Sequence, residues 1–280
     1  MPEETIRFGH SPDPDDAFMY WPLARRRVET EGLVFEQVLE DIESLNRRAL
    51  EGELETTAAS VHACAYLADR YAILPCGASM GEGYGPIVVS REPMSTSDLA
   101  GSMVAVPGIM TSAYLALRLA IGVFKYIVVP FDRIPDAVKE GKAQAGLLIH
   151  EGQITWRQEG LHNVLDLGVW WRDRTGGLPL PLGVNIVRKD LGDDTMRRIG
   201  RVLRRAIDYS LTHRDEALDY AGGFGRGLPA PQTDRFVSMY VNDRTRDCGA
   251  DGRRAIERLL AEGRAASIIR GGTPSPSFVL

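Results

Sequence analysis

The middle of the chain most constrains the fold, because its apolar residues change period several times in succession. Short apolar runs at residues 103–106, 126–129 and 145–149 have the length and β-branched content of buried strands. Between them, residues 111–121 and 132–141 carry apolar residues at helical spacing. Strands that alternate with helices predict a mostly parallel sheet with helices on both faces. The sequence therefore predicts an α/β fold.

The same alternation occurs before residue 91 and gives way to helical patterns after residue 190. A polar, turn-forming stretch at 91–98 and a strand at 183–187 predict two crossings between lobes. We expect two α/β lobes, with lobe 1 formed by residues 1–92 and 186–280 and lobe 2 inserted as residues 93–185. Two crossings predict a cleft between the lobes, and such clefts are preferred small-molecule sites.

Two stretches are expected to lack regular structure. Residues 170–182 contain two glycines and two prolines within a short span, which is typical of a loop. Residues 271–277 are rich in glycine, proline and serine, and we expect this tail to be loosely held.

Composition excludes several classes of protein. The chain has 280 residues, 44% of them hydrophobic and 25% charged, which is typical of a globular protein. A net charge of −5 argues against nucleic-acid binding. No apolar stretch approaches the roughly 20 residues that span a bilayer, and residues 1–5 lack the pattern of a signal peptide. We therefore expect a cytoplasmic protein that binds neither nucleic acid nor membrane.

The cysteines support a reducing compartment. Cys64, Cys76 and Cys248 are odd in number and widely spaced, so neither a disulfide framework nor a structural zinc site is expected. Buried free thiols are predicted instead.

His150 is the first candidate for chemistry, because it follows the apolar run that ends at Ile149. Ligands bind at the carboxyl ends of strands in open α/β sheets, and an imidazole changes charge near neutral pH. His150 is therefore a candidate general base. The alternative is a histidine that only hydrogen-bonds a loop. Glu151 either orients His150 or simply begins the next helix.

Hydroxyl side chains follow three other predicted strands. Thr111 and Ser112 stand at a helix start after a glycine turn, where N–H groups can bind a carboxylate; the alternative is that one of them only caps the helix. Ser60 ends another predicted strand, and it is either a ligand contact or a loop serine. Ser11 opens an acidic turn that either contacts ligand hydroxyls or only caps its helix.

Several chemistries are disfavoured because their motifs are absent. The sequence has no Gly-x-x-x-x-Gly-Lys-Ser/Thr loop, no His-Glu-x-x-His helix and no Gly-x-Ser-x-Gly elbow. Phosphoryl transfer, zinc hydrolysis and serine hydrolysis are thereby disfavoured. We expect a general base beside a carboxylate pocket, without metal or other cofactor.

The chain resembles the 1,4-dihydroxy-6-naphthoate synthase family of the futalosine route to menaquinone. The motifs that carry the resemblance are, in chain order, Ser11-Pro-Asp-Pro-Asp-Asp-Ala-Phe-Met, Leu39-Glu-Asp-Ile-Glu-Ser-Leu-Asn, Val106-Pro-Gly, Thr111-Ser-Ala-Tyr, Gly146-Leu-Leu-Ile-His-Glu-Gly-Gln, Asp166-Leu-Gly-x-Trp-Trp, Leu178-Pro-Leu-Pro-Leu-Gly and Tyr240-Val-Asn. The resemblance implies the two-lobed fold of type II periplasmic binding proteins. It also implies a lyase that splits cyclic dehypoxanthine futalosine into 1,4-dihydroxy-6-naphthoate and a three-carbon, sugar-derived fragment.

The resemblance also implies roles for particular residues. The family's proposed proton acceptor matches His150, and its paired hydroxyls match Thr111 and Ser112. Its ligand contacts from the serine-ending segment match Ala58, Ala59 and Ser60. We add Ser11 to the expected substrate contacts.

The chain departs from the family pattern at three positions. The family commonly has Ser-Pro-Cys-Pro-Asn-Asp, where this chain has Asp13 and Asp15. It often has a lysine where Ala58 stands here. These changes remove positive or neutral polar groups from the expected binding surface.

Two other functions fit the same motifs less well. A non-catalytic binding protein for a small carboxylate would use the same two-lobed shape. The sister activity, chorismate dehydratase, shares the fold, but the Ile-His-Glu and Leu-Pro-Leu-Pro-Leu-Gly stretches point away from it. The expected partner is a small-molecule carboxylate, and either a monomer or a homodimer is compatible with the sequence.

Overall fold

The computed structural model describes residues 4–279. Residues 1–3, which belong to the segment considered for a signal peptide, and Leu280 lie outside the described residues. The chain divides into two compact units, each with its own core. Unit 1 comprises residues 1–79, 183–253 and 272–280, and unit 2 comprises residues 80–182 and 254–271. The lobe boundaries expected from the sequence stay a prediction.

Unit 1 is built around a sheet whose strands run in the order β12-β4-β11-β3-β1-β2. Its strands are β1 (Glu4–His10), β2 (Leu33–Leu39), β3 (Thr56–Ser60), β4 (Tyr71–Ile73), β11 (Leu180–Arg188) and β12 (Ser277–Phe278). Its helices are α1 (Pro14–Ala24), α2 (Ile42–Glu51), α3 (Val61–Leu67), η3 (Lys189–Leu191), α8 (Gly192–Thr212), α9 (Arg214–Gly222), α10 (Ala230–Tyr240) and α11 (Asp243–Arg246). The strand β5 (Ser79–Gly81), the first residues of β11 and the helix α12 (Gly249–Ala265) cross the division between the units.

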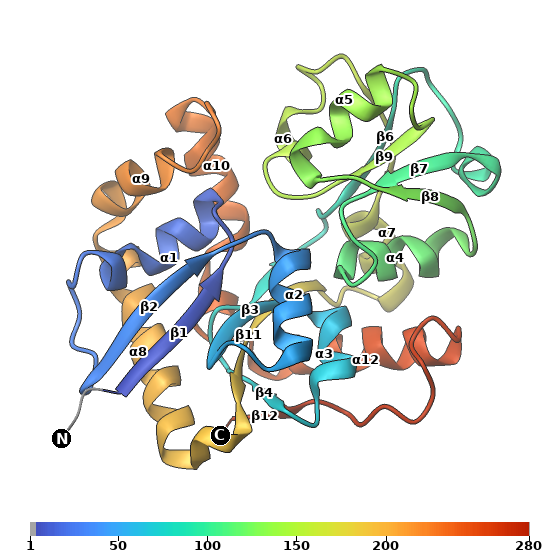
Figure 1. Cartoon of the computed structure of the whole chain (residues 1–280). Coiled ribbons are helices and arrows are strands. Elements are labelled where there is room, and N and C mark those ends of the chain that lie inside the picture. The colour runs from blue at the N-terminus through green and yellow to red at the C-terminus, as the bar shows by residue number, and fades with distance from the viewer. Residues whose placement is uncertain (1–3, 280) are drawn as a thin grey trace. The chain divides into compact units, whose positions relative to one another are not determined.

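Helices cover both faces of this sheet. The helices α1, α8, α9 and α10 lie on one face, and α2 and α3 lie on the other (Figure 1). The larger core cluster joins Ile6 and Phe8 of β1 to apolar residues of α1 and α8. A smaller cluster under α2 contains Leu45 and Leu54. Gly9 is required in β1, because a Cβ there would lie 2.7 Å from Leu45 Cδ2.

Unit 2 is built around a five-stranded sheet in the order β10-β6-β9-β7-β8. Its strands are β6 (Ile87–Ser90), β7 (Met103–Val106), β8 (Lys125–Val128), β9 (Ala145–Leu148) and β10 (His162–Asp166). Its helices are η1 (Thr96–Gly101), α4 (Ser112–Ile121), η2 (Phe131–Arg133), α5 (Ile134–Lys139), α6 (Gly152–Thr155) and α7 (Leu167–Thr175). The pairs β7–β8 and β7–β9 are parallel, whereas β6 pairs antiparallel with β9 and β10.

The strand β9 lies against α5 at van der Waals distance. A Cβ at Gly146 would lie 2.6 Å from Ile134 Cγ2 and 2.8 Å from Val138 Cγ2. Both partners belong to the core cluster on this face of the sheet. The helices α5 and α6 lie on one face of the sheet of unit 2, and α4 and α7 lie on the other (Figure 1).

The alternation predicted for residues 103–149 is confirmed, with element ends displaced by one or two residues at several boundaries. The expectation that residues 170–182 are irregular is wrong at both ends of this stretch, because α7 continues to Thr175 and β11 already begins at Leu180. The carboxylate of Asp166 accepts hydrogen bonds from the N–H groups of Gly168 and Val169 and so caps α7. Trp171 is buried, and its indole N–H donates to Pro179 O at 2.9 Å. Burial of this ring holds the helix despite the flanking glycines.

The tail is also more ordered than expected at its end. Ser277 and Phe278 form β12, which pairs parallel with β4. Val279 is buried, and its N–H donates to Ile73 O at 2.9 Å. Pairing with an edge strand thus anchors the segment after the proline-rich turn.

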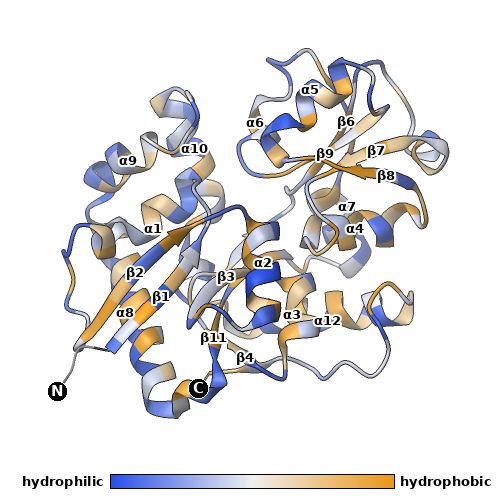
Figure 2. Cartoon of the chain, viewed as in Figure 1, coloured by the Kyte–Doolittle hydropathy of each residue, from blue (hydrophilic) through white to orange (hydrophobic). Residues whose placement is uncertain are grey.

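Burial of apolar side chains follows the predicted pattern. In Figure 2, hydrophobic residues concentrate on the strands of each sheet, and hydrophilic residues on the outer sides of the helices. The three cysteines are buried free thiols, as predicted, and burial raises the pKa of Cys64 and of Cys76 to about 12. Of the helices within residues 4–279, none combines the length and apolar character needed to cross a membrane.

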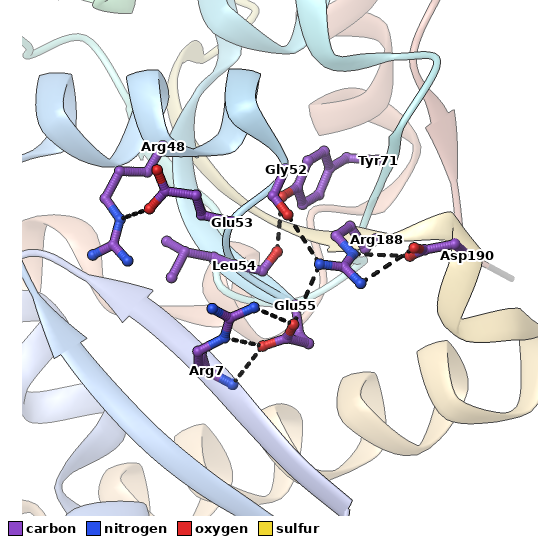
Figure 3. A network of polar contacts seen from close by, with 9 residues as sticks. All are labelled: Arg7, Arg48, Gly52, Glu53, Leu54, Glu55, Tyr71, Arg188 and Asp190. Carbon is purple, nitrogen blue, oxygen red and sulfur yellow. Dashed lines mark hydrogen bonds and ion pairs between the residues drawn. The ribbon is translucent and has the colours of Figure 1, made fainter.

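A buried carboxylate links three strands of unit 1 (Figure 3). Glu55, directly before β3, accepts hydrogen bonds from the main-chain N–H, Nε and Nη2 of Arg7 in β1. Arg188 at the end of β11 donates to the same carboxylate and to Asp190. Burial raises the pKa of Glu55, but the hydrogen bonds and charge of Arg7 outweigh it and leave that pKa below its usual range. This network lies at the opposite end of β3 from Ser60.

Candidate functional site

Three parallel strands of unit 1 end at one edge of its sheet. The strand β1 pairs parallel with β2 and with β3, so His10, Leu39 and Ser60 end neighbouring strands there. The turn that begins at Ser11 leaves from this edge. Ser11 and Ser60, two of the predicted substrate contacts, therefore lie at the same edge of this sheet.

Ser60 is held by a reciprocal pair of hydrogen bonds with Asn46 of α2. The Ser60 N–H donates to Asn46 Oδ1 at 2.8 Å, and Asn46 Nδ2 donates to Ser60 Oγ at 3.0 Å. Both residues are buried. The serine is thus fixed in position, and its hydroxyl proton is left for another acceptor.

Ala58 and Ala59 lie in the middle of β3, between β1 and β11. In the antiparallel register with β11, Ala58 faces Asn185 and Ala59 faces Val184. Both alanines are buried. Their methyl groups offer only apolar contact, so a ligand contact here depends on shape rather than on charge.

The turn from Ser11 to Asp16 is acidic and largely buried. Asp13 is the N-cap of α1, and its Oδ1 accepts the N–H of Asp16 at 3.2 Å. Asp16 Oδ2 accepts the N–H of Ser11 at 2.7 Å. Burial, together with the charges of Asp13 and Asp16, raises the pKa of Asp15 well above its usual range. Burial also lowers the pKa of His10.

In unit 2, the predicted general base and the predicted carboxylate site end adjacent strands. Val106 ends β7 and Leu148 ends β9, and these strands are parallel neighbours. The segment after β7 leads to Thr111 and α4, while the segment after β9 leads to His150. Both features therefore lie at the same edge of the sheet of unit 2.

His150 is only partly buried and has a φ of +51°, in the left-handed region. Such a φ is uncommon for a residue other than glycine, and it occurs at functional turns. The imidazole meets the ring of Phe131 edge-on, with the centroids 4.7 Å apart. The carbonyl of His150 accepts the N–H of Gln153 at 3.1 Å. The main chain and Phe131 together restrict the orientation of the imidazole.

The two hydroxyls at the start of α4 are already engaged within the protein. Thr111 Oγ1 accepts the N–H of Tyr114 at 3.2 Å and donates to Gly108 O at 2.9 Å. Ser112 Oγ donates to Leu182 O at 2.6 Å. The capping role considered for Thr111 is therefore observed. A hydroxyl has a single proton, so neither hydroxyl has a second proton to donate to an anion.

Glu151 precedes the short helix α6 and accepts main-chain hydrogen bonds at its start. Its carbonyl receives the N–H groups of Ile154 and Thr155 at 3.0 and 3.1 Å. The structure thus supports the interpretation of Glu151 as a helix start.

Two residues whose side chains contact the candidate site residues were not predicted from the sequence. Asn46 stands at the end of a quoted motif, but only the contact between α2 and β3 shows that it holds Ser60. Phe131 follows a predicted strand, and its contact with His150 depends on the loops after β8 and β9. A buried asparagine on an otherwise apolar helix face is the signal that could have identified Asn46.

Comparison with known protein families gives one match over most of the chain. A family model described as menaquinone biosynthesis matches residues 6–265. A 1,4-dihydroxy-6-naphtoate synthase from Thermus thermophilus is 44% identical over 99% of this chain and 100% of that protein. A protein of the same name from Streptomyces coelicolor is 35% identical over 96% of each chain.

Solved structures show the same relationship at the level of the fold. A crystal structure of a protein from Archaeoglobus fulgidus has a TM-score of 0.92 and 44% identity, and it covers 96% of this chain and 100% of that chain. The alkanesulfonate-binding protein from Xanthomonas axonopodis has a TM-score of 0.70 at 12% identity, with 98% of this chain and 96% of that chain covered. The similarity to the alkanesulfonate-binding protein confirms the predicted periplasmic-binding-protein-like fold.

Proposed function

The chain belongs to the menaquinone biosynthesis family, and from this premise we propose that it is a carbon–carbon lyase that forms 1,4-dihydroxy-6-naphthoate. Its substrate is cyclic dehypoxanthine futalosine, and a three-carbon, sugar-derived fragment is the second product. The similarity to two synthases of this name over nearly their whole length supports the proposal.

The observation that carries the proposal is the position of His150. His150 follows β9 and is partly exposed as a residue, and its imidazole is restricted in orientation by Phe131 and by the left-handed turn. Release of an aromatic ring by cleavage of a carbon–carbon bond requires removal of one proton. We assign this step to the neutral imidazole of His150. General base catalysis of this kind contributes about 10²–10⁴-fold in rate.

The substrate carboxylate binds at the start of α4 in this proposal. The first turn of the helix presents N–H groups and the positive end of the helix dipole. Thr111 and Ser112 hold the preceding loop through their hydrogen bonds to Gly108 O and Leu182 O. The carboxylate is thus held from the end of the strand next to the one that leads to His150, which limits its orientation.

Ser60, Ala58, Ala59 and Ser11 are further substrate contacts that we propose. Ser60, fixed by Asn46, offers a hydroxyl at the carboxyl edge of the sheet of unit 1. Ala58 and Ala59 offer apolar methyl groups on opposite faces of β3, and Ser11 offers a second hydroxyl at the same edge. We further propose that the reaction needs neither metal nor redox cofactor, because aromatisation supplies the driving force. The protein acts in the cytoplasm, as a monomer or a homodimer.

The test is turnover of the cyclic substrate by wild-type protein and by His150→Ala. We expect wild type to form dihydroxynaphthoate and the variant to lose about 10²–10⁴-fold in kcat, with part of the rate restored by added imidazole. His162→Ala, which removes an exposed histidine of the same unit, is the matched control. Wild-type protein that binds the substrate without product would instead indicate a binding protein. Near-wild-type rates in His150→Ala would refute the base assignment.

A further inference from the structure

The turn between β1 and α1 holds two buried oxygen atoms that make no hydrogen bond with any of the described residues. They are Ser11 Oγ and Asp15 Oδ1. Ser11 is 2% exposed and Asp15 is 6% exposed. Buried polar atoms are almost always paired in folded proteins, and those left without a partner often have a functional reason.

The neighbouring carboxylates of this turn are used by the main chain. Asp16 Oδ2 accepts the Ser11 N–H, and Asp13 Oδ1 accepts the Asp16 N–H. These bonds hold the start of α1 against the end of β1. Asp15 Oδ1 and Ser11 Oγ contribute nothing to this arrangement, so their burial costs free energy without a compensating bond.

The location of these two atoms indicates a ligand. Ser11 follows the last residue of β1, at the same edge of the sheet where Ser60 ends β3. The carboxyl edge of a parallel sheet is where open α/β folds bind small molecules. A ligand at this edge would supply the partners that the fold does not.

We propose that Ser11 and Asp15 form a subsite for uncharged hydroxyl groups, and that these groups belong to the sugar-derived part of the substrate. This inference rests on the proposed lyase function and assigns the part of the substrate that leaves as the three-carbon fragment.

The electrostatics of the turn favour hydroxyl groups over ions. Three carboxyl groups within four residues repel an anion. Burial and the charges of Asp13 and Asp16 raise the pKa of Asp15, so its carboxyl group tends to hold a proton, which a bound cation would oppose. A protonated carboxyl group and a serine hydroxyl can each both donate and accept. That combination matches hydroxyl groups, which do the same.

The experiment compares binding of the substrate and of 1,4-dihydroxy-6-naphthoate by titration calorimetry. Every protein carries His150→Ala so that the substrate is not consumed, and wild type here means unchanged at residues 11, 15 and 210. The proteins are wild type, Ser11→Ala, Asp15→Ala, Asp15→Asn and the control Ser210→Ala. Ser210 is a fully buried serine in α8 of the same unit, and its hydroxyl donates to Met19 O. Circular dichroism verifies that each variant is folded.

We expect Ser11→Ala and Asp15→Ala each to weaken substrate binding about tenfold, equivalent to about 1.4 kcal/mol, and to change product binding less than twofold. Asp15→Asn, which keeps a neutral donor and acceptor, stays within about threefold of wild type. Substrate binding by wild type weakens as pH rises through the raised pKa of Asp15, whereas binding by Asp15→Asn does not.

Three results would overturn the subsite. In the first, Ser11→Ala and Asp15→Ala bind the substrate as tightly as Ser210→Ala. In the second, they lose substrate and product equally. In the third, Mg²⁺ or Mn²⁺ strengthens substrate binding by wild type and not by Asp15→Asn, which identifies a cation site. Binding without turnover by protein that retains His150 refutes only the lyase function, and absence of substrate binding by wild type refutes both proposals.

Discussion

Replacement of Glu55 by alanine tests whether its buried ion pair stabilises unit 1. The side chain of Glu55 is 12% exposed, and Arg7 donates to it at 3.0, 2.8 and 2.7 Å. Hydrogen bonds to charged groups contribute about 1.5–3 kcal/mol each. Because the Arg7 side chain is 42% exposed, water replaces the lost carboxylate in the variant and reduces the loss of stability. Arg188 keeps Asp190 and Gly52 O as partners. We therefore expect a loss of about 2–3 kcal/mol, below the 3–5 kcal/mol typical of a fully buried pair.

Glu53→Ala is the matched control, two residues away in the same network (Figure 3). Its carboxylate is 47% exposed and pairs with Arg48 at 2.7 Å. Exposed pairs contribute about 0–1 kcal/mol. By scanning calorimetry, where 1 kcal/mol shifts the Tm of a domain of this size class by about 2–4 °C, Glu55→Ala should lower the Tm by at least about 4 °C. Equal shifts in the two variants would refute the reasoning.

The same pair predicts a dependence on pH. Because the pKa of Glu55 is lowered in the folded state, the stabilisation is fully present above its unfolded pKa of about 4.3. It is lost as the pH falls through the lower, folded-state pKa. The Tm difference between wild type and Glu55→Ala should therefore shrink below about pH 4.3. A difference that is constant between pH 7 and pH 3 would contradict the assigned charge interaction.

Two further predictions concern packing and the support of the site. Gly146→Ala should destabilise unit 2 by about 1–3 kcal/mol in urea unfolding, because the new Cβ would lie 2.6 Å from Ile134 Cγ2. Gly101→Ala is the control, because a Cβ there meets nothing within 4 Å and the free energy of unfolding should change little. Asn46→Ala should lower the free energy of unfolding by about 2–3 kcal/mol and raise KM, because Ser60 loses the partner that holds it. Asn46→Asp keeps the acceptor for the Ser60 N–H and should recover part of both losses. An unchanged KM in both variants would show that Ser60 does not contact the substrate.

Much of the fold could be predicted because its signals are local. Asp41 and Gly52 bound α2 through signals that can be recognised in a sequence, since a side-chain cap and a left-handed glycine act within a few residues. The strands β7, β8 and β9 follow from short apolar runs. The helix α7 was not predicted, because its stability depends on the burial of Trp171 and on the hydrogen bond from its indole to Pro179 O. Contacts of that kind produce no periodic pattern in the sequence.

In the candidate site too, some features could be predicted from local sequence and others depend on tertiary contacts. The position of His150 at a strand end follows from the run that precedes it, and the family resemblance supplied its proposed role. Its left-handed φ and the ring of Phe131 against it are known only from the structure. The hydroxyl of Ser112 was predicted to face a ligand, yet in the structure it donates to Leu182 O, 70 residues away.

The sequence by itself determined the α/β class, the end of each strand where chemistry is placed, and the family to which the motifs belong. These properties depend on periodicity, caps and motif order, all of which act along the chain. Only the tertiary structure decided which of the predicted groups already have partners. Ser60 is held by Asn46, whereas Ser11 Oγ and Asp15 Oδ1 have no hydrogen-bond partner among the described residues. The physical reason is that a hydrogen bond depends on distance and direction in space, which residues far apart in the chain acquire only through packing.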